Sequence, residues 1–169
     1  TLTNSELGIT NSVAYALEKF GIEVQDKKEL RVFIGPPLKY SFEHFYGFSE
    51  EESLQAVEYY REYFSEKGLY ENEVYKGIRE ILSSLKQADK KLIVATSKPE
   101  NFSIQILKHF DLYDYIDFVA GATMDGSRCK KADVIGYALE KTKIKNLSET
   151  IMVGDREHDI IGAPATKSK

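Results

Sequence analysis

The stretch Leu92-Ile93-Val94-Ala95-Thr96-Ser97-Lys98-Pro99 decides the class of fold. Its first four residues form a short, continuous apolar run, which is typical of a β-strand buried on both faces. Residues 102–110 follow with apolar residues at helical spacing, and two further apolar runs, residues 116–120 and 151–153, come after helical or polar segments. This alternation of strand and helix predicts an α/β fold, with a Rossmann-like parallel sheet covered by helices on both faces.

The first half of the chain predicts helices only. Apolar residues recur at helical spacing from Ser5 to Phe20, and again in segments that begin near Pro37 and Ser49. Ser49 followed by Glu52 is the pattern of a capping box at a helix start. We therefore expect an α-helical bundle over residues 9–74, joined to an α/β core over residues 75–169.

The composition excludes several classes of protein. The chain has 169 residues, of which 42% are hydrophobic and 30% charged, and its formal net charge is −4. A basic surface for nucleic acid is therefore not expected, and no apolar stretch has the roughly 20 residues of a membrane span. The single cysteine, Cys129, cannot form a disulfide within the chain. We expect a cytoplasmic protein, a monomer or weak homodimer, that binds neither nucleic acid nor membranes.

Two hydroxyl groups follow the first predicted strand. Thr96 and Ser97 lie between that strand and a predicted helix. Ligands of open parallel sheets bind beyond the carboxyl ends of the strands, and the free N–H groups of a helix N-terminus attract anions. The pair therefore indicates an anion site. The alternative is that one hydroxyl only caps the helix.

Two carboxylates follow the third apolar run. Asp155 and Asp159 are four residues apart in a predicted turn, and Gly154 lets the backbone approach closely. Mg²⁺ is commonly held by one or two protein carboxylates together with water and phosphate oxygens. The alternative is a helix cap at Asp155 with Asp159 on a solvated first turn. Between the hydroxyls and the carboxylates, a lysine within residues 128–131 can bring positive charge to a phosphate, or can lie on the surface.

Taken in order, the hydroxyls, the lysine and the paired aspartates resemble the haloacid dehalogenase-like phosphatase superfamily. The resemblance is to its phosphoglycolate phosphatase-type branch, which carries a helical cap. Residues 94–99 are similar to the family's second motif and residues 154–159 to the fourth. Lys131, with Lys130 as the alternative register, matches the third motif. Residues 33–38 resemble the cap signature of that branch.

The resemblance implies a Mg²⁺-dependent phosphatase that hydrolyses a small phosphomonoester, such as phosphoglycolate, a nucleotide or a sugar phosphate. The family route passes through an aspartyl-phosphate intermediate. The residues that the resemblance assigns to the phosphate are Thr96, Ser97, Lys98 and Lys131, with Thr96 and Lys131 catalytic. The residues assigned to Mg²⁺ are Asp155 and Asp159. A sugar-phosphate mutase of the same superfamily and a non-enzymatic helical interaction module remain alternatives.

One part of the family pattern is missing. The first motif, Asp-x-Asp-Gly-Thr, supplies the nucleophile and its acid/base partner, and only its tail is similar to Thr1-Leu2-Thr3. We therefore expect residues 1–8 to be a remnant of the core's first strand and loop, and the chain to be truncated at both ends. Residues 1–169 alone are then not expected to turn over a phosphate ester.

Overall fold

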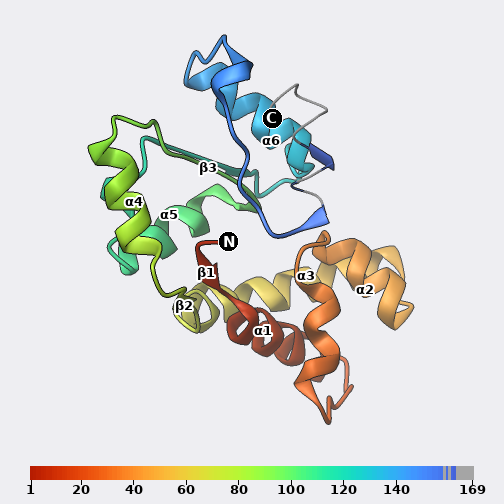
Figure 1. Ribbon diagram of the computed structural model, residues 1–169. Coiled ribbons are helices and arrows are strands. Elements are labelled where there is room, and N and C mark those ends of the chain that lie inside the picture. The colour runs from red at the N-terminus through yellow and green to blue at the C-terminus, as the bar shows by residue number, and fades with distance from the viewer. Residues whose placement is uncertain (158, 160, 163–169) are drawn as a thin grey trace. The chain divides into compact units, whose positions relative to one another are not determined.

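The computed structural model describes residues 1–157, 159, 161 and 162, and the chain divides into two compact units. One unit comprises residues 3–73, and the other comprises residues 1–2 and 74–169. The chain passes between the units twice. The two crossings pair with each other as the short strands β1 (Thr3–Asn4) and β2 (Glu73–Val74) (Figure 1). The end of the predicted core, residues 158, 160 and 163–169, lies outside the described residues.

The unit of residues 3–73 is helical, as predicted. Its elements are α1 (Glu6–Glu18), the 3₁₀-helix η1 (Lys27–Phe33), α2 (Leu38–Tyr46), α3 (Glu50–Tyr63) and the π-helical turn η2 (Phe64–Gly68). The predicted capping box opens α3. The backbone N–H of Ser49 donates to the Glu52 carboxylate at 2.8 Å, and the N–H of Glu52 donates to the Ser49 hydroxyl at 3.3 Å. Local hydrogen bonds therefore set this helix start.

Aromatic side chains fill the core of the helical unit. Phe33, Phe42 and Phe64 are at most 2% exposed, and the rings of Phe33 and Phe42 meet edge to face with centroids 4.9 Å apart. Gly8 of α1 approaches the backbone of Gly68 so closely that a Cβ on Gly8 would lie 2.1 Å from the Gly68 carbonyl oxygen. The helices of this unit are thus packed without spare volume at this crossing.

The second unit is an α/β unit. Its elements are α4 (Ile78–Gln87), β3 (Ile93–Pro99), α5 (Glu100–His109), η3 (Tyr113–Tyr115), β4 (Phe118–Ala122), α6 (Lys131–Lys141) and η4 (Leu147–Glu149). Strands β3 and β4 pair in parallel, with Ile93 opposite Phe118 and Ala95 opposite Ala120. The parallel arrangement agrees with the prediction from the alternating pattern.

Helices cover both faces of this strand pair. Val119 belongs to a cluster with Leu82 of α4 and Leu107 of α5, whereas the next residue, Ala120, packs with Val134 of α6. Successive side chains of a strand point to opposite faces, so α4 and α5 lie on one face and α6 on the other. This order places the carboxyl end of β3 next to the start of α6, where the site residues come together.

The prediction of a third strand at residues 151–153 is wrong for this structure. None of these residues is assigned to a strand, and Ile151 and Val153 are 78% and 73% exposed. A strand is stable only when its N–H and C=O groups pair with a neighbouring segment, and no described residue forms a ladder with this run. An apolar, β-branched composition alone therefore does not make a strand here.

Candidate functional site

The carboxyl end of β3 carries the predicted hydroxyl pair. Thr96 accepts a hydrogen bond at its hydroxyl oxygen from the N–H of Lys98, at 3.2 Å, so this hydroxyl closes a local turn just before α5. Ser97 is partly buried beside it. Burial lowers the pKa of Lys98 to about 8, and its amine is therefore still largely protonated at neutral pH. These residues hold hydroxyls and a positive charge directly before a helix N-terminus.

Lys131, the first residue of α6, reaches this strand end. Its ammonium donates to the carbonyl oxygen of Ala95 at 3.1 Å and pairs with the Asp159 carboxylate at 2.8 Å. The side chains of Lys131 and Asp159 are 14% and 7% exposed, whereas Lys130 is exposed. Of the two registers left open by the sequence, Lys131 is the lysine that contacts β3, at Ala95.

The turn that carries Asp159 is packed tightly around its carboxylate. The second carboxylate oxygen accepts the backbone N–H of Arg156 at 3.2 Å. A Cβ on Gly154 would lie 2.3 Å from that oxygen, and one on Gly162 would lie 2.8 Å from Cγ of Lys131. An added Cβ at either position would force the Asp159 or Lys131 side chain to shift, so the lysine–aspartate pair is closely packed.

Asp155 is more exposed than Asp159 and has a different partner. One of its carboxylate oxygens accepts a hydrogen bond from the Thr1 hydroxyl. The guanidinium of Arg156 lies 3.5 Å from the other oxygen. The hydrogen bond from the Thr1 hydroxyl lowers the pKa of Asp155, so this side chain is ionised at neutral pH.

The residues present fit a magnesium ion that relies on few protein ligands. No group of three or more His, Cys, Asp or Glu side chains among the described residues is arranged to hold a metal. Mg²⁺ needs no such group, since water and phosphate oxygens complete its shell. Asp155 fits as a direct ligand because it is ionised and about half exposed, whereas Asp159 is buried. Both oxygens of Asp159 have partners within the chain, so it fits better as a ligand through water.

Every site residue predicted from the sequence lies in the α/β unit. The structure brings Lys131 and Asp159 into direct contact and joins both to the end of β3. The contact of Thr1 with Asp155 and the support of Lys131 by Gly162 were missed. No sequence signal predicts such contacts, because they join residues far apart in the chain.

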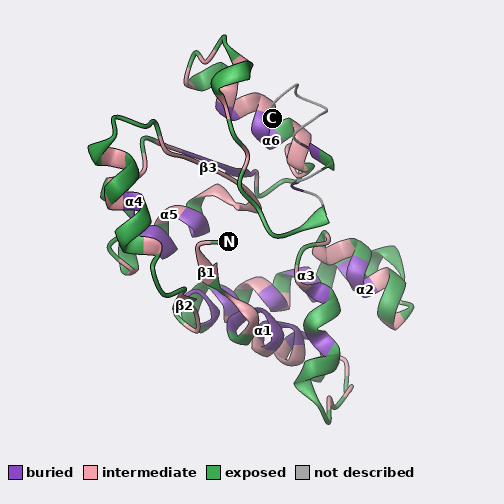
Figure 2. Cartoon of the chain, in the orientation of Figure 1, coloured by how far each residue is buried: buried purple, intermediate pink, exposed green. Residues whose placement is uncertain are grey.

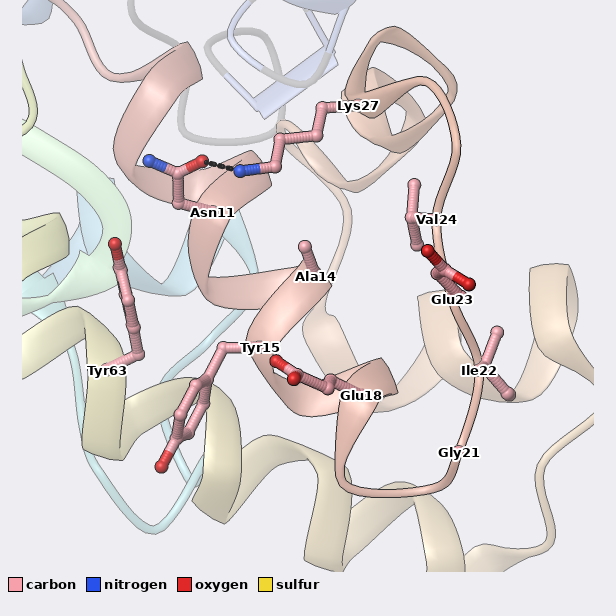
Figure 3. Close-up of a pocket in the computed structure, with 10 residues that line it drawn as sticks. All are labelled: Asn11, Ala14, Tyr15, Glu18, Gly21, Ile22, Glu23, Val24, Lys27 and Tyr63. Atoms are coloured by element: carbon pink, nitrogen blue, oxygen red, sulfur yellow. Dashed lines mark hydrogen bonds between the residues drawn. The ribbon is translucent and has the colours of Figure 1, made fainter.

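A separate cavity of about 520 Å³ lies in the helical unit, between α1 and the segment that follows it (Figure 3). Its lining includes Tyr15, Tyr63 and the side chain of Asn11, which accepts a 2.7 Å hydrogen bond from Lys27. None of the predicted phosphate or metal residues lines this cavity. We therefore assign the chemistry to the strand ends and not to this cavity.

Comparisons with known proteins agree with this assignment. A family model described as haloacid dehalogenase-like hydrolase matches residues 1–169. A 5'-nucleotidase of Pseudomonas aeruginosa is 42% identical over 163 residues, which are 96% of this chain and 73% of that protein. The tyrosine-protein kinase PtkA of Mycobacterium tuberculosis is 38% identical over 167 residues, which are 98% of this chain and 56% of that protein.

Solved structures show the same fold. A predicted phosphatase from Clostridium acetobutylicum matches with a TM-score of 0.94 and 52% identity, over 99% of this chain and 77% of that chain. A putative phosphatase from Clostridium difficile matches with a TM-score of 0.88 and 45% identity, over 99% and 78%. These matches confirm the predicted class, an α/β core with added helices. Among the described residues, none of the helices has the length and hydropathy needed to cross a membrane.

Proposed function

We propose that this chain carries the phosphate-binding and metal-binding residues of a phosphatase for small phosphomonoesters. The basis is that the chain belongs to the haloacid dehalogenase-like hydrolase family, as its resemblance predicted. The phosphatase names among its relatives support an enzyme of this type. The reaction consumes one water molecule and releases an alcohol and inorganic phosphate. Hydrolysis of this kind requires that the charge on the phosphate oxygens be neutralised.

The observation that carries this proposal is the position of Lys131. Its ammonium is held between the carbonyl oxygen of Ala95 and the Asp159 carboxylate. Ala95 directly precedes Thr96 in the sequence. A phosphate bound at the start of α5 would meet this ammonium and the free N–H groups of the helix. The side chain needs no rearrangement to reach it, because its position is already fixed by packing.

We propose Mg²⁺ as the metal, held by Asp155 directly and by Asp159 through water. When bound, the ion supplies positive charge that stabilises developing negative charge on the phosphate oxygens. Asp159 would keep Lys131 in place through its ion pair.

Neither carboxylate at this edge is proposed as the nucleophile. Asp159 is buried and paired on both oxygens, and Asp155 is the proposed metal ligand. The aspartate nucleophile and the aspartyl-phosphate route thus remain what the family resemblance implies. We propose that residues 3–73 act as the cap that contacts the organic part of the substrate. Nucleoside monophosphates are the first substrates to test, since one relative is named a 5'-nucleotidase.

Replacement of Asp155 tests the metal assignment. In the full-length protein, we expect Asp155→Asn to lower turnover of a phosphomonoester at least about tenfold and to raise the Mg²⁺ concentration needed for half-maximal rate, because a formal charge facing the cation is lost. The measurement is a titration with Mg²⁺ and a chromogenic phosphate ester. Asp114→Asn, an exposed aspartate in η3, is the control and should behave as wild type. An unchanged Mg²⁺ dependence of Asp155→Asn would exclude it from the metal site.

A further inference from the structure

Arg128 links three elements of the α/β unit. Its Nε donates to the carbonyl oxygen of Gly121 in β4 at 2.9 Å, and its Nη2 lies 3.1 Å from the Glu100 carboxylate at the start of α5. The guanidinium also stacks over the ring of Tyr137 in α6, with Cζ 3.6 Å from the ring centroid. Planar, multidentate contacts of this kind hold a guanidinium in one position.

Glu100 is the second member of the same cluster. The carboxylate oxygen that pairs with Arg128 also accepts the backbone N–H of Gly121 at 3.1 Å. The backbones are in direct contact as well, since a Cβ on Gly121 would lie 2.4 Å from Cα of Glu100. The side chains of Arg128 and Glu100 are 20% and 31% exposed, so water screens this pair only in part.

The two halves of the proposed phosphate site depend on the elements that this cluster joins. Thr96 and Ser97 lie four and three residues before Glu100, respectively, and Lys131 lies three residues after Arg128. The segment before Lys131 is tied to the same place, because Thr123 and Arg128 exchange two hydrogen bonds of 3.0 Å. A shift of α5 against α6 would therefore separate the hydroxyls from the ammonium.

We propose that Arg128 and Glu100 are positioning residues that set the distance between the hydroxyl side and the lysine side of the phosphate site. This inference rests on the proposed function for the identity of the ligand. Neither residue needs to touch the phosphate, because the guanidinium is already occupied by Gly121, Glu100 and Tyr137. Precise placement matters, since shifts of about 1 Å can change catalytic rates by about two orders of magnitude.

Glu100→Gln separates positioning from a direct effect of charge. The replacement removes a negative charge near the phosphate, so a purely electrostatic effect would leave phosphate binding unchanged or strengthen it. Positioning predicts the opposite. In the full-length protein with Mg²⁺, we expect Glu100→Gln and Arg128→Ala each to raise the dissociation constant of inorganic phosphate about tenfold, measured by calorimetry. The double variant should be no weaker than Arg128→Ala alone, because the two residues act as one unit.

Rescue and a matched control complete the test. Arg128→Lys should recover part of the affinity, since lysine can still pair with Glu100 but cannot hold Gly121 and Tyr137 in the same way. Lys86→Ala breaks another ion pair of this unit, that of Lys86 with Asp117, and should leave phosphate binding unchanged. Variants of Arg128 and Glu100 that melt earlier but bind phosphate as wild type does would overturn the proposal.

The same measurements separate this inference from the proposed function. If the wild-type protein binds inorganic phosphate but hydrolyses no phosphomonoester, the proposed function fails while the positioning effect is still decided by the dissociation constants. If the wild type turns over substrate and the Glu100 and Arg128 variants keep its affinity and turnover, the positioning effect fails and the function stands. A wild type that binds no phosphate at all would overturn both.

Discussion

The core of the helical unit and the strand-forming segments of the α/β unit are buried to different degrees. In residues 3–73, Phe33 and Phe42 are at most 2% exposed. In the α/β unit every residue of β3 remains partly exposed, and Ile151 and Val153 are exposed; Figure 2 colours the chain by these burial classes.

The difference shows how helices and strands each satisfy the hydrogen bonds of their backbone groups. A helix pairs its N–H and C=O groups four residues apart within one segment, so the helical unit needs only side-chain packing to be complete. A strand depends on neighbouring segments for the same hydrogen bonds. Among the described residues β3 pairs with β4 alone, and residues 151–153 have no ladder partner. Burial in the α/β unit is therefore limited by the number of strands that meet.

Two replacements that shorten a side chain to alanine test this comparison with the largest expected effect. Phe42→Ala should lower the free energy of unfolding by about 4 kcal/mol, because it empties a fully buried aromatic site beside Phe33. Ile151→Ala should lower it by less than about 0.5 kcal/mol, because Ile151 is exposed. Urea unfolding followed by circular dichroism measures both. Comparable losses would mean that Ile151 is packed against a partner.

Glycine replacements test the close helix crossing. Gly8→Ala should cost about 3 kcal/mol, since the new Cβ meets the backbone carbonyl of Gly68 rather than a movable side chain. Gly136→Ala is the matched control in α6, where a Cβ would meet no atom within 4 Å. It should stabilise the protein by about 0.5–1 kcal/mol. Thermal unfolding that moves in the same direction for both variants would contradict the assigned crossing.

The capping box at the start of α3 tests how much local hydrogen bonds stabilise the helical unit. Ser49→Ala should cost about 1 kcal/mol, because the N–H of Glu52 loses its acceptor at the start of α3. Ser49→Thr keeps a hydroxyl at the same position and should cost clearly less. Chemical denaturation of the two variants in parallel measures the difference, and equal losses would show that the hydroxyl does not cap this helix.

The smallest expected effect concerns a long-range contact of the α/β unit. Asp117 pairs with Lys86 at 2.8 Å and accepts the N–H of Leu92 at 2.7 Å, and these contacts, that of Lys86 first, lower its pKa below the ordinary value of 3.8. A lowered carboxyl pKa contributes stability above the unfolded-state pKa and loses it as the pH falls through the folded-state pKa.

Asp117→Asn should therefore cost less than about 1 kcal/mol at pH 7, as expected for a largely exposed ion pair. The difference from wild type should persist down to about pH 5 and shrink as the pH falls through and below 3.8. Unfolding free energies measured between pH 7 and pH 3 test this. A difference that grows on acidification would contradict the sign of the pKa shift.

Much of this fold follows from the sequence alone. The helix start at Ser49 was predictable, because capping hydrogen bonds act within a few residues. The position of the hydroxyls of Thr96 and Ser97 toward the carboxyl end of β3 was also predictable, since ligands of parallel sheets bind toward the carboxyl ends of the strands. These features depend on local geometry and on connectivity only.

The tertiary structure decided the contacts between segments. It placed Lys131 rather than Lys130 beside Ala95, buried Asp159 against that lysine, and left residues 151–153 without a strand neighbour. Residues 95 and 131 are 36 positions apart. The local sequence does not indicate which of two adjacent lysines will point inward. That choice follows from how α6 packs on the strands, because ion pairs and sheet ladders exist only once distant segments have met.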